Sequence, residues 1–341
     1  MAVTKITDII TPEIYLGYRA EQFPELNAFI KSGIYTAPPP DVVSQLNAGG
    51  DMIKSPYWDY IPRGAPQIPS DNDASDITPK KVSADKMSMR KHYWVEAWSS
   101  MDLSGIMATG NRKDPEGHLL KSLANYWVGA EQTMLIASCI GLFADNAAND
   151  SADMTYSVYS DITSPVAANK FSRSAFDRAC NTLGDRMGDV VAIAMHSSVY
   201  LSLHDNEDID FVHDSKLEKD IPHYKGRLVI VDDQMPVTTG TNSDKYTSYL
   251  FGRGAFAYAK AALDADYIIE SEREPLTGNG GGQTTTVVRE QCLLHPMGAD
   301  WLEGSVAGVS PTEIELKSAA NWDRKYVRKN IKIASLETNA A

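Results

Sequence analysis

The chain has 341 residues, of which 43% are hydrophobic and 23% are charged. This balance is typical of a globular protein and excludes a wholly disordered chain, and the length allows roughly two domains or one domain with long insertions. Lysine and arginine number 32 against 45 aspartates and glutamates, which gives a formal net charge of -13. A phosphate backbone would repel so acidic a chain, which argues against a general nucleic-acid-binding protein unless one face is strongly basic.

Three cysteines, Cys139, Cys180 and Cys292, cannot all pair within one chain, and none belongs to a C-x-x-C motif. We expect small buried thiols in a reducing compartment. The longest unbroken apolar run, Val190 to Met195, is far shorter than the ~20 residues a bilayer requires, and the N-terminus does not resemble a secretion signal. The sequence therefore predicts a soluble protein, cytoplasmic where it is made, with no membrane partner.

Residues 1–50 are predicted to form an arm rather than a domain. Short apolar pieces are separated by Pro12, Pro24 and Gly33, and Pro38 to Pro40 and Gly49-Gly50 are expected to end any regular structure. Such a segment cannot build a core of its own, so it must lie on something else or remain loose.

Residues 51–105 predict a long β-hairpin that forms an extended loop. One strand is expected within Asp51 to Ile61 and a second within Val82 to Met101, because both are rich in β-formers. Between them Arg63 to Lys81 is a polar, turn-rich tip that contains three prolines and the acids Asp71, Asp73 and Asp76.

The second strand of this hairpin carries apolar side chains on both faces. Trp94 and Trp98 fall on one face, and the two-residue period of a strand places five others on the opposite face, namely Met87, Met89, Tyr93, Val95 and Ala97. An isolated hairpin cannot cover both faces. Two interpretations stay open: a limb that packs on neighbouring subunits, or an internal strand of an ordinary sheet. If the strand is a limb that packs on neighbouring subunits, truncating Trp94 should impair assembly more than it lowers subunit stability.

The segment 106–170 is dominated by one helix, predicted over about 114–146. Asp114 is a good N-cap, Pro115 suits the first turn, and apolar residues recur at helical spacing as far as Phe143. This helix is much longer than average, so it is expected to be the spine of an elongated unit.

From residue 171 to the end, alternating helix and strand signals predict a small α/β domain with a central sheet, followed by returning strands. Ser172 or Ser174 can cap the first helix. The later predicted elements, in chain order, are strand Val190 to Met195, helix Ser197 to Leu203, strand Leu228 to Val231, strand Thr247 to Phe251, helix Ala255 to Ala262, strands Tyr267 to Glu270 and Thr284 to Leu294 around a Gly278 to Gly282 loop, and strand Val327 to Leu336.

One stretch imitates a dinucleotide-binding fingerprint. Gly252 to Ala257 reads G-x-G-x-x-A, and Glu270 and Glu272 follow at about the distance of a ribose-binding acid. It occurs late in the chain, and Arg253 and Phe256 would crowd a pyrophosphate. A tight turn into a helix explains the motif better, so no cofactor is expected.

A second stretch could be taken for a metal site: His204, Asp205, Glu207, Asp208, Asp210, His213 and Asp214. Its spacing matches neither an EF-hand loop nor H-E-x-x-H, so a solvated acidic loop between a helix and a strand is the better interpretation. His196 is expected to be a satisfied, partly buried histidine, and His295 with Pro296 to end a strand. Nothing assembles a nucleophile, a base and an orienting group, so we expect no catalytic, cofactor-binding or metal-binding residues.

With this order of elements, the chain resembles the major capsid proteins of tailed bacteriophages. Four stretches carry the resemblance: Leu183-Gly184-Asp185 through Ser197, Tyr224 to Asp233 with Met235-Pro236, Arg289 with Leu294 to Gly298 and Trp301, and Asn321 to Arg324 through Arg328 to Ile331. The resemblance covers essentially the whole chain. It implies an α+β fold with an N-terminal arm, an extended loop at 51–105, a peripheral domain on a spine helix, and an axial domain.

In that family the axial domains crowd around five-fold and six-fold axes, and the extended loop lies over a neighbouring subunit. The resemblance thus implies an icosahedral virion shell of hexamers and pentamers, assembled in the host cytoplasm, that encloses double-stranded DNA without sequence-specific binding. A separate scaffolding protein, a portal and possibly a decoration protein would be its partners. Two alternatives remain: an encapsulin-type compartment shell, and a soluble α/β enzyme that binds a nucleotide at Gly252 to Ala257.

Overall fold

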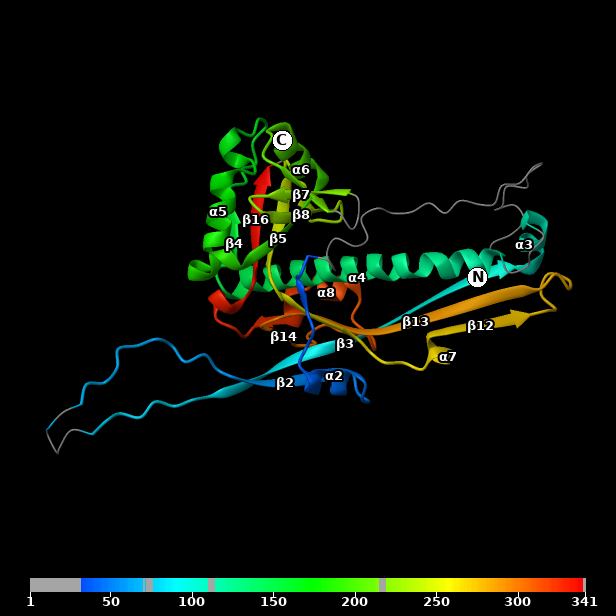
Figure 1. Cartoon of the computed structure of the whole chain (residues 1–341), viewed down its shortest axis with the longest axis horizontal. Coiled ribbons are helices and arrows are strands. Elements are labelled where there is room, and N and C mark those ends of the chain that lie inside the picture. The colour runs from blue at the N-terminus through cyan, green and yellow to red at the C-terminus, as the bar shows by residue number, and fades with distance from the viewer. Residues whose placement is uncertain (1–31, 70, 72–75, 110–113, 215–218, 340–341) are drawn as a thin grey trace.

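The computed structural model describes residues 32–69, 71, 76–109, 114–214 and 219–339. Figure 1 shows an elongated molecule in which the helix α4 (Asp114–Asn149) runs along the long axis beside two long strands. A compact lobe stands on one end of this body, and a hairpin projects past the same end. Residues 1–31 of the predicted arm lie outside the described residues.

A long sheet forms the elongated body. Its strand order is β1-β11-β13-β3-β2, and β12 pairs with β13 on the edge opposite β3. The bounds are β1 Tyr35–Thr36, β2 Met52–Trp58, β3 Ala84–Met101, β11 Phe256–Lys260, β12 Ile269–Glu274 and β13 Gln283–Pro296. The first half of β3 pairs with β2 and its second half pairs with β13, so one 18-residue strand belongs both to the hairpin and to the body.

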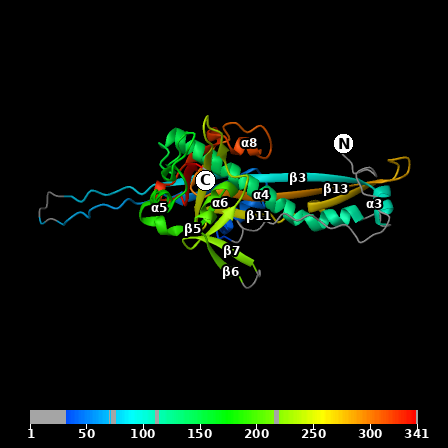
Figure 2. The ribbon, with the colours of Figure 1, turned by 90° about the horizontal axis from the view of Figure 1, so that it is seen from above.

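A compact sheet of eight strands forms the lobe. Its order is β4-β16-β10-β5-β8-β7-β6, and β9 pairs with β10. The bounds are β4 Thr155–Ser157, β5 Val190–Met195, β6 Asp210–Asp214, β7 Lys219–Tyr224, β8 Arg227–Val231, β9 Val237–Thr238, β10 Lys245–Gly252 and β16 Ile333–Asn339. The predicted strand at 190–195 is confirmed with identical bounds. Figure 2 shows the β6 and β7 hairpin reaching out of the lobe.

Helices cover both faces of the compact sheet. The helices α5 (Arg173–Asn181) and α6 (Ser197–Asp205) pack on one face, where Phe176 and Leu203 are fully buried. Ser172, one of the two predicted caps, accepts the backbone N–H of Ala175 and begins α5. On the other face Phe143 of α4 stacks on Tyr249, with ring centroids 5.1 Å apart. A strand covered on both faces is expected to be apolar throughout, as β5 is.

The remaining described elements are short. They are α2 (Pro40–Leu46), α3 (Asp102–Thr109), α7 (Ala265–Ile268), α8 (Glu313–Leu316), the strand pair β14 (Ala299–Trp301) and β15 (Trp322–Arg324), and 3-10 turns at Ala167–Asn169, Gly184–Asp189, Ala319–Asn321 and Arg328–Asn330.

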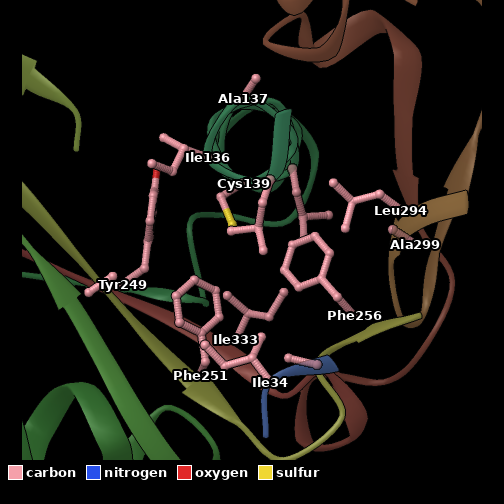
Figure 3. Close-up of a cluster of buried hydrophobic side chains, with 14 of the residues drawn as sticks. Ile34, Ile136, Ala137, Cys139, Tyr249, Phe251, Phe256, Leu294, Ala299 and Ile333 are labelled. Carbon is pink, nitrogen blue, oxygen red and sulfur yellow. The ribbon is translucent and has the colours of Figure 1, made fainter. Parts of the chain in front are cut away.

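The C-terminal half of α4 is the centre of the core. Figure 3 shows Cys139 of α4 among side chains from both sheets, with Phe251 and Ile333 from the compact sheet and Phe256 and Leu294 from the long sheet. The segment Asn125–Asn149 is apolar and long enough to cross a membrane, but 61% of its most apolar window is buried inside the protein. Its composition is therefore explained by core packing.

A glycine makes the tightest contact of this helix possible. A Cβ built on Gly141 would lie 2.0 Å from the carbonyl oxygen of Leu316 and 2.4 Å from the indole nitrogen of Trp322. The same indole donates a 2.8 Å hydrogen bond to that carbonyl. Only glycine therefore allows α8 and β15 to approach α4 this closely.

Four predictions are corrected. The strand predicted over Tyr267 to Glu270 is split, because helix α7 runs to Ile268 and strand β12 begins only at Ile269. Residues 255–262 do not form a helix: residues 256–260 are strand β11, because backbone pairing to β1 and β13 and the burial of Phe256 between the sheets outweigh the helical preference of the alanines. The last strand is Ile333–Asn339 rather than 327–336, since a 3-10 turn at Arg328–Asn330 precedes it. The prolines do not end regular structure, because Pro40 begins α2 in the first-turn position that suits proline.

The interpretation that both faces of the second hairpin strand need a neighbouring subunit is also wrong. Trp94 stacks on Trp127 of α4 with centroids 6.2 Å apart, and Trp98 makes an edge contact with Tyr126 at 5.2 Å. The chain's own helix covers the tryptophan face, so Trp94 contributes to subunit stability.

We expect Trp94→Ala to lower the free energy of unfolding by about 2–3 kcal/mol, because it removes a half-buried aromatic contact with α4. Val95→Ala on the opposite, exposed face is the matched control and should change it by no more than about 0.5 kcal/mol. Urea denaturation of both variants measures the difference. Equal stability of the Trp94 variant and the wild type would contradict the packing described above.

Candidate assembly surfaces

The first candidate surface is the part of the hairpin that projects beyond the body. The last backbone hydrogen bond between its arms joins Asp59 N to Ser83 O at 3.0 Å. Among the described residues further out, only Gln67 and Thr78 join the arms, through two side-chain to backbone hydrogen bonds of 2.7 and 2.9 Å. Asp71 and Asp76 are exposed, whereas Asp73 of the predicted acidic tip lies outside the described residues.

This projecting part exposes large apolar side chains. Six of them are more than half exposed, namely Trp58, Tyr60, Ile61, Ile68, Ile77 and Val82. Ile68 reaches 89%. A contiguous apolar surface that a chain cannot cover by itself marks a site of protein–protein contact. The most exposed apolar side chains of the hairpin therefore lie on its outer part and not on the tryptophan face of β3.

The second candidate surface is the face of the long sheet that α4 does not cover, here called the open face. The register of β3, β13 and β12 places Val95, Ala97 and Val287 on it, because residues directly opposite in an antiparallel pair share a face. Val95 is 61% exposed. Along the β12 edge the same face carries an acidic row of Glu270, Glu272 and Glu274. The open face thus combines exposed apolar residues with a negative edge.

A cluster of charges under α4 ties the helix to the long sheet. The Lys260 ammonium of β11 lies 2.8 Å from carboxylate oxygens of both Glu131 of α4 and Glu290 of β13. The Tyr258 hydroxyl donates a 2.6 Å hydrogen bond to Glu131. The Glu131 and Glu290 side chains are only 2% and 12% exposed. One lysine therefore faces two nearly buried carboxyl groups.

Burial shifts the protonation of this cluster. Burial raises the pKa of Glu290, and the neighbouring Glu131 carboxyl raises it further, although Lys260 partly opposes the shift. For Lys260 burial lowers the pKa, but hydrogen bonds to the two glutamates outweigh it and the pKa is raised. Relative to the unfolded chain, the folded state thus favours a proton on Glu290 and a charge on Lys260.

The dinucleotide-like motif forms no cofactor cradle. Gly252 ends β10, and Gly254 adopts a left-handed turn at φ 66° beside Thr36 before β11 begins. The predicted tight turn is confirmed, but it leads into a strand. Glu270, the predicted ribose partner, instead bonds Arg289 at 3.1 Å. A nucleotide site at this motif has no support in these contacts.

The other candidate residues have structural partners. The acidic stretch is not one loop, because α6 runs to Asp205 and β6 begins at Asp210. Within the residues the structure describes, no three metal-ligating side chains cluster. His196 caps α6 by accepting the Ser198 N–H at 3.1 Å, and His295 bonds the Ala299 carbonyl at 2.8 Å while burial lowers its pKa to about 4.

The cysteines behave as predicted. All three are buried and free, and burial raises the pKa of each thiol, to about 11 for Cys180.

Comparison with known proteins gives these surfaces a context. A family model described as "Major capsid protein 13-like" (Gp13-like) matches residues 42–334. The major capsid protein of Bacillus phage SPP1 is 34% identical over 339 residues, which cover 99% of this chain and 98% of the relative.

Solved capsid structures share the fold. The capsid protein of Ralstonia phage GP4 superposes with a TM-score of 0.59 and is 11% identical in sequence. The capsid protein of cyanophage Pam1 also superposes with a TM-score of 0.59 and is 10% identical. Each superposition covers 97% of this chain and 96% of the other chain. The head structure of Helicobacter pylori bacteriophage KHP40 superposes with a TM-score of 0.55 at 9% sequence identity. This superposition covers 99% of this chain and 97% of the other chain.

The α+β fold is thus the fold of tailed-phage major capsid proteins, as predicted. The chain belongs to the Gp13-like major capsid protein family. It is a structural protein of the phage shell and not an enzyme, and this identity is favoured over both the compartment shell and the nucleotide-binding enzyme.

Sequence reasoning missed two features of these surfaces. The alternating Glu270, Glu272 and Glu274 is a period-two signal that could have located the acidic row. The cluster of Glu131, Lys260 and Glu290 has no local signal, because its members come from three different elements. Glu131 lies more than 120 residues before both of its partners in the chain.

We expect the stability of the wild type to fall as pH rises through the raised pKa of Glu290. Because the folded state favours the protonated carboxyl, the stability it contributes is complete below its ordinary pKa of 4.5 and is lost at higher pH. Glu290→Gln keeps the side chain neutral at every pH. As pH rises from 5 to 9, the free energy of unfolding of the variant should therefore increase by about 1 kcal/mol relative to that of the wild type.

Thermal melts across this range measure the effect. Glu313→Gln, which removes an exposed carboxyl paired with Lys317, is the control and should parallel the wild type. If the melting temperatures of Glu290→Gln and the wild type changed with pH in the same way, the assignment of a raised pKa to Glu290 would be contradicted.

Proposed function

We propose that copies of this chain build a closed icosahedral shell by laying the outer hairpin of one subunit on the long sheet of the next. The observation that carries the proposal is the exposed apolar outer hairpin, whose described residues 60–69 and 76–82 make no hydrogen bond or ion pair with the body. A two-stranded ribbon is marginally stable alone and gains stability when it is covered. A head-to-tail contact of this kind, in which each subunit both gives and receives a limb, generates a closed ring when the rotation between successive copies closes.

The open face of the long sheet is the surface we assign to receive the hairpin. Its Val95, Ala97 and Val287 offer apolar area to the isoleucines of the limb. Its acidic row along β12 offers charges opposite to Arg63, Lys80 and Lys81 at the base of the tip. Complementary charges set the register of a contact more than its strength.

The domain roles follow from the same proposal. The long sheet with α4 would form the peripheral domain, with its spine helix at 114–149. The compact sheet would form the axial domain within 171–341, with its β6 and β7 strands toward the symmetry axis. The residues from 32 to 50 would form the base of the arm, since Ile34, Val42 and Leu46 are fully buried on the body.

We further propose that assembly takes place in the host cytoplasm with a separate scaffolding protein and a portal, and that a decoration protein is a further candidate partner. The shell would enclose double-stranded DNA without sequence-specific contacts. The net charge of -13 supports containment of the genome rather than tight binding of it by every subunit.

Replacing Arg63 to Lys81 with a two-residue Asn-Gly turn should leave a folded subunit that forms no closed particles. The subunit should survive because its core makes almost no contact with this segment. Circular-dichroism melts report folding, and electron microscopy reports particles.

A point-mutant pair sharpens the test. Ile68→Ser with Ile77→Ser should reduce particle yield at least tenfold, and the matched Ile68→Leu with Ile77→Leu should assemble normally. Normal closed shells formed by the chain in which Arg63 to Lys81 is replaced by Asn-Gly would contradict the proposal.

Charge reversal tests the receiving surface separately. Glu272→Lys with Glu274→Lys should reduce assembly, because the limb's lysines would then face like charges. Adding Lys80→Glu and Lys81→Glu should restore much of the particle yield at the wild-type net charge. Subunit melting should stay unchanged throughout, since these groups are exposed. Absence of rescue, with all variants folded, would place the hairpin on a different surface.

A further inference from the structure

The root of the hairpin is held by the chain itself on both faces of β3. On one face Val42 and Leu46 of α2 pack on Ile53, Met87 and Met89, and all five are buried. On the other face lies the loop between β14 and α8, which spans residues 302–312. The strand is therefore sandwiched immediately before it leaves the body.

Arg90 is the centre of the contact on the loop side. Its side chain is 6% exposed, and its guanidinium contacts the Glu303 carboxylate, lies 3.0 Å from Asp51, and donates to the Val309 carbonyl at 2.7 Å. Asp51 directly precedes β2, whereas Glu303 and Val309 belong to the loop. One side chain thus joins both arms of the hairpin to the body.

Lys91, the next residue, makes the corresponding contact on the opposite face. It is fully buried, and its ammonium donates a 2.6 Å hydrogen bond to the Ala48 carbonyl just after α2. Burying a cation is costly unless hydrogen bonds hold it. Two successive buried cations on opposite faces therefore resist tilting of the strand in either direction, because a tilt would break one set of bonds.

The direction of the limb depends on this root. Beyond Asp59 the arms have little support, and Asp59 to Pro69 can extend for about 35 Å at ~3.3 Å per residue. An error of ~10° at the root would then move the tip by about 6 Å, on the order of the spacing between neighbouring strands. A small change of angle would misplace the whole contact.

We propose that Arg90, with Lys91 on the opposite face, is a positioning residue for assembly: it fixes the angle at which the hairpin leaves the subunit. The consequence for assembly rests on the proposed function, in which the hairpin docks on the next subunit. The fixed angle itself is a property of the single subunit.

The test measures that angle in the unassembled subunit. Spin labels at Ile61→Cys on the hairpin and Asn181→Cys on α5 report their separation, and the three native cysteines are buried and should stay unlabelled. In the Arg90 wild-type background we expect one narrow distance distribution. Arg90→Met should broaden it at least twofold, Glu303→Gln should broaden it less, and Arg90→Lys should partly restore it.

A matched control separates positioning from general destabilisation. Arg324 is 14% exposed, and among the described contacts its guanidinium bonds Asp150 and Asp153, which follow α4, and no residue of the hairpin. Arg324→Met should lower the melting temperature comparably but leave the distance distribution narrow. A narrow distribution in a folded Arg90→Met subunit, or equal broadening in the Arg324 variant, would overturn the proposal. If Arg90→Met does not fold, the Glu303→Gln variant takes its place in the test: a narrow distance distribution in that folded variant would overturn the proposal.

Particle imaging then links the angle to the shell. Arg90→Met should give open or irregular assemblies, and Arg324→Met should give closed shells at reduced yield. Broadened distances with normal shells would retain the angular role and refute hairpin docking instead, so the two proposals fail separately.

Discussion

The packing of α4 against both sheets is the contact on which the rest of the molecule depends. Its C-terminal half fills the space between the compact sheet and the long sheet, and Gly141 lets β15 and α8 close in from a further side. Its N-terminal half covers the tryptophan face of β3. A single helix thus fixes the lobe and the elongated body in one arrangement, and both candidate surfaces are held relative to it.

That arrangement leaves some apolar area that no other described part of the chain covers. The outer hairpin projects from the body, and the open face of the long sheet lies opposite α4. In an enzyme, exposed area of this kind would be a liability. In the shell proposed above, the next copy would cover the same area, and the hydrophobic effect that folds the subunit would also drive assembly. The acidic row and the basic residues at the base of the tip would then select the register.

Charges inside the subunit serve a different purpose from charges on its surface. Lys260 between two glutamates ties β11 and β13 to the helix, while Arg90 and Lys91 hold the root of the limb. Each cation joins segments that are distant in sequence. Such bonds contribute modest net stability but penalise alternative geometries. For a subunit that must meet its copies at a defined angle, that penalty is useful.

The sequence by itself determined the local elements whose signals are periodic: β5, the start of α4 at Asp114, the Ser172 cap and the two strands of the hairpin. It also determined the class of protein, through the order of these elements and the four stretches that carry the resemblance. Tertiary structure alone decided that residues 256–260 are a strand, since ladder partners and burial outweigh alanine propensity. It alone decided what covers Trp94, because alternation shows that a face is apolar but not which element lies on it. The bonds of Arg90 to a loop more than 200 residues away were likewise unreadable, because a charged residue carries no local mark of its distant partner.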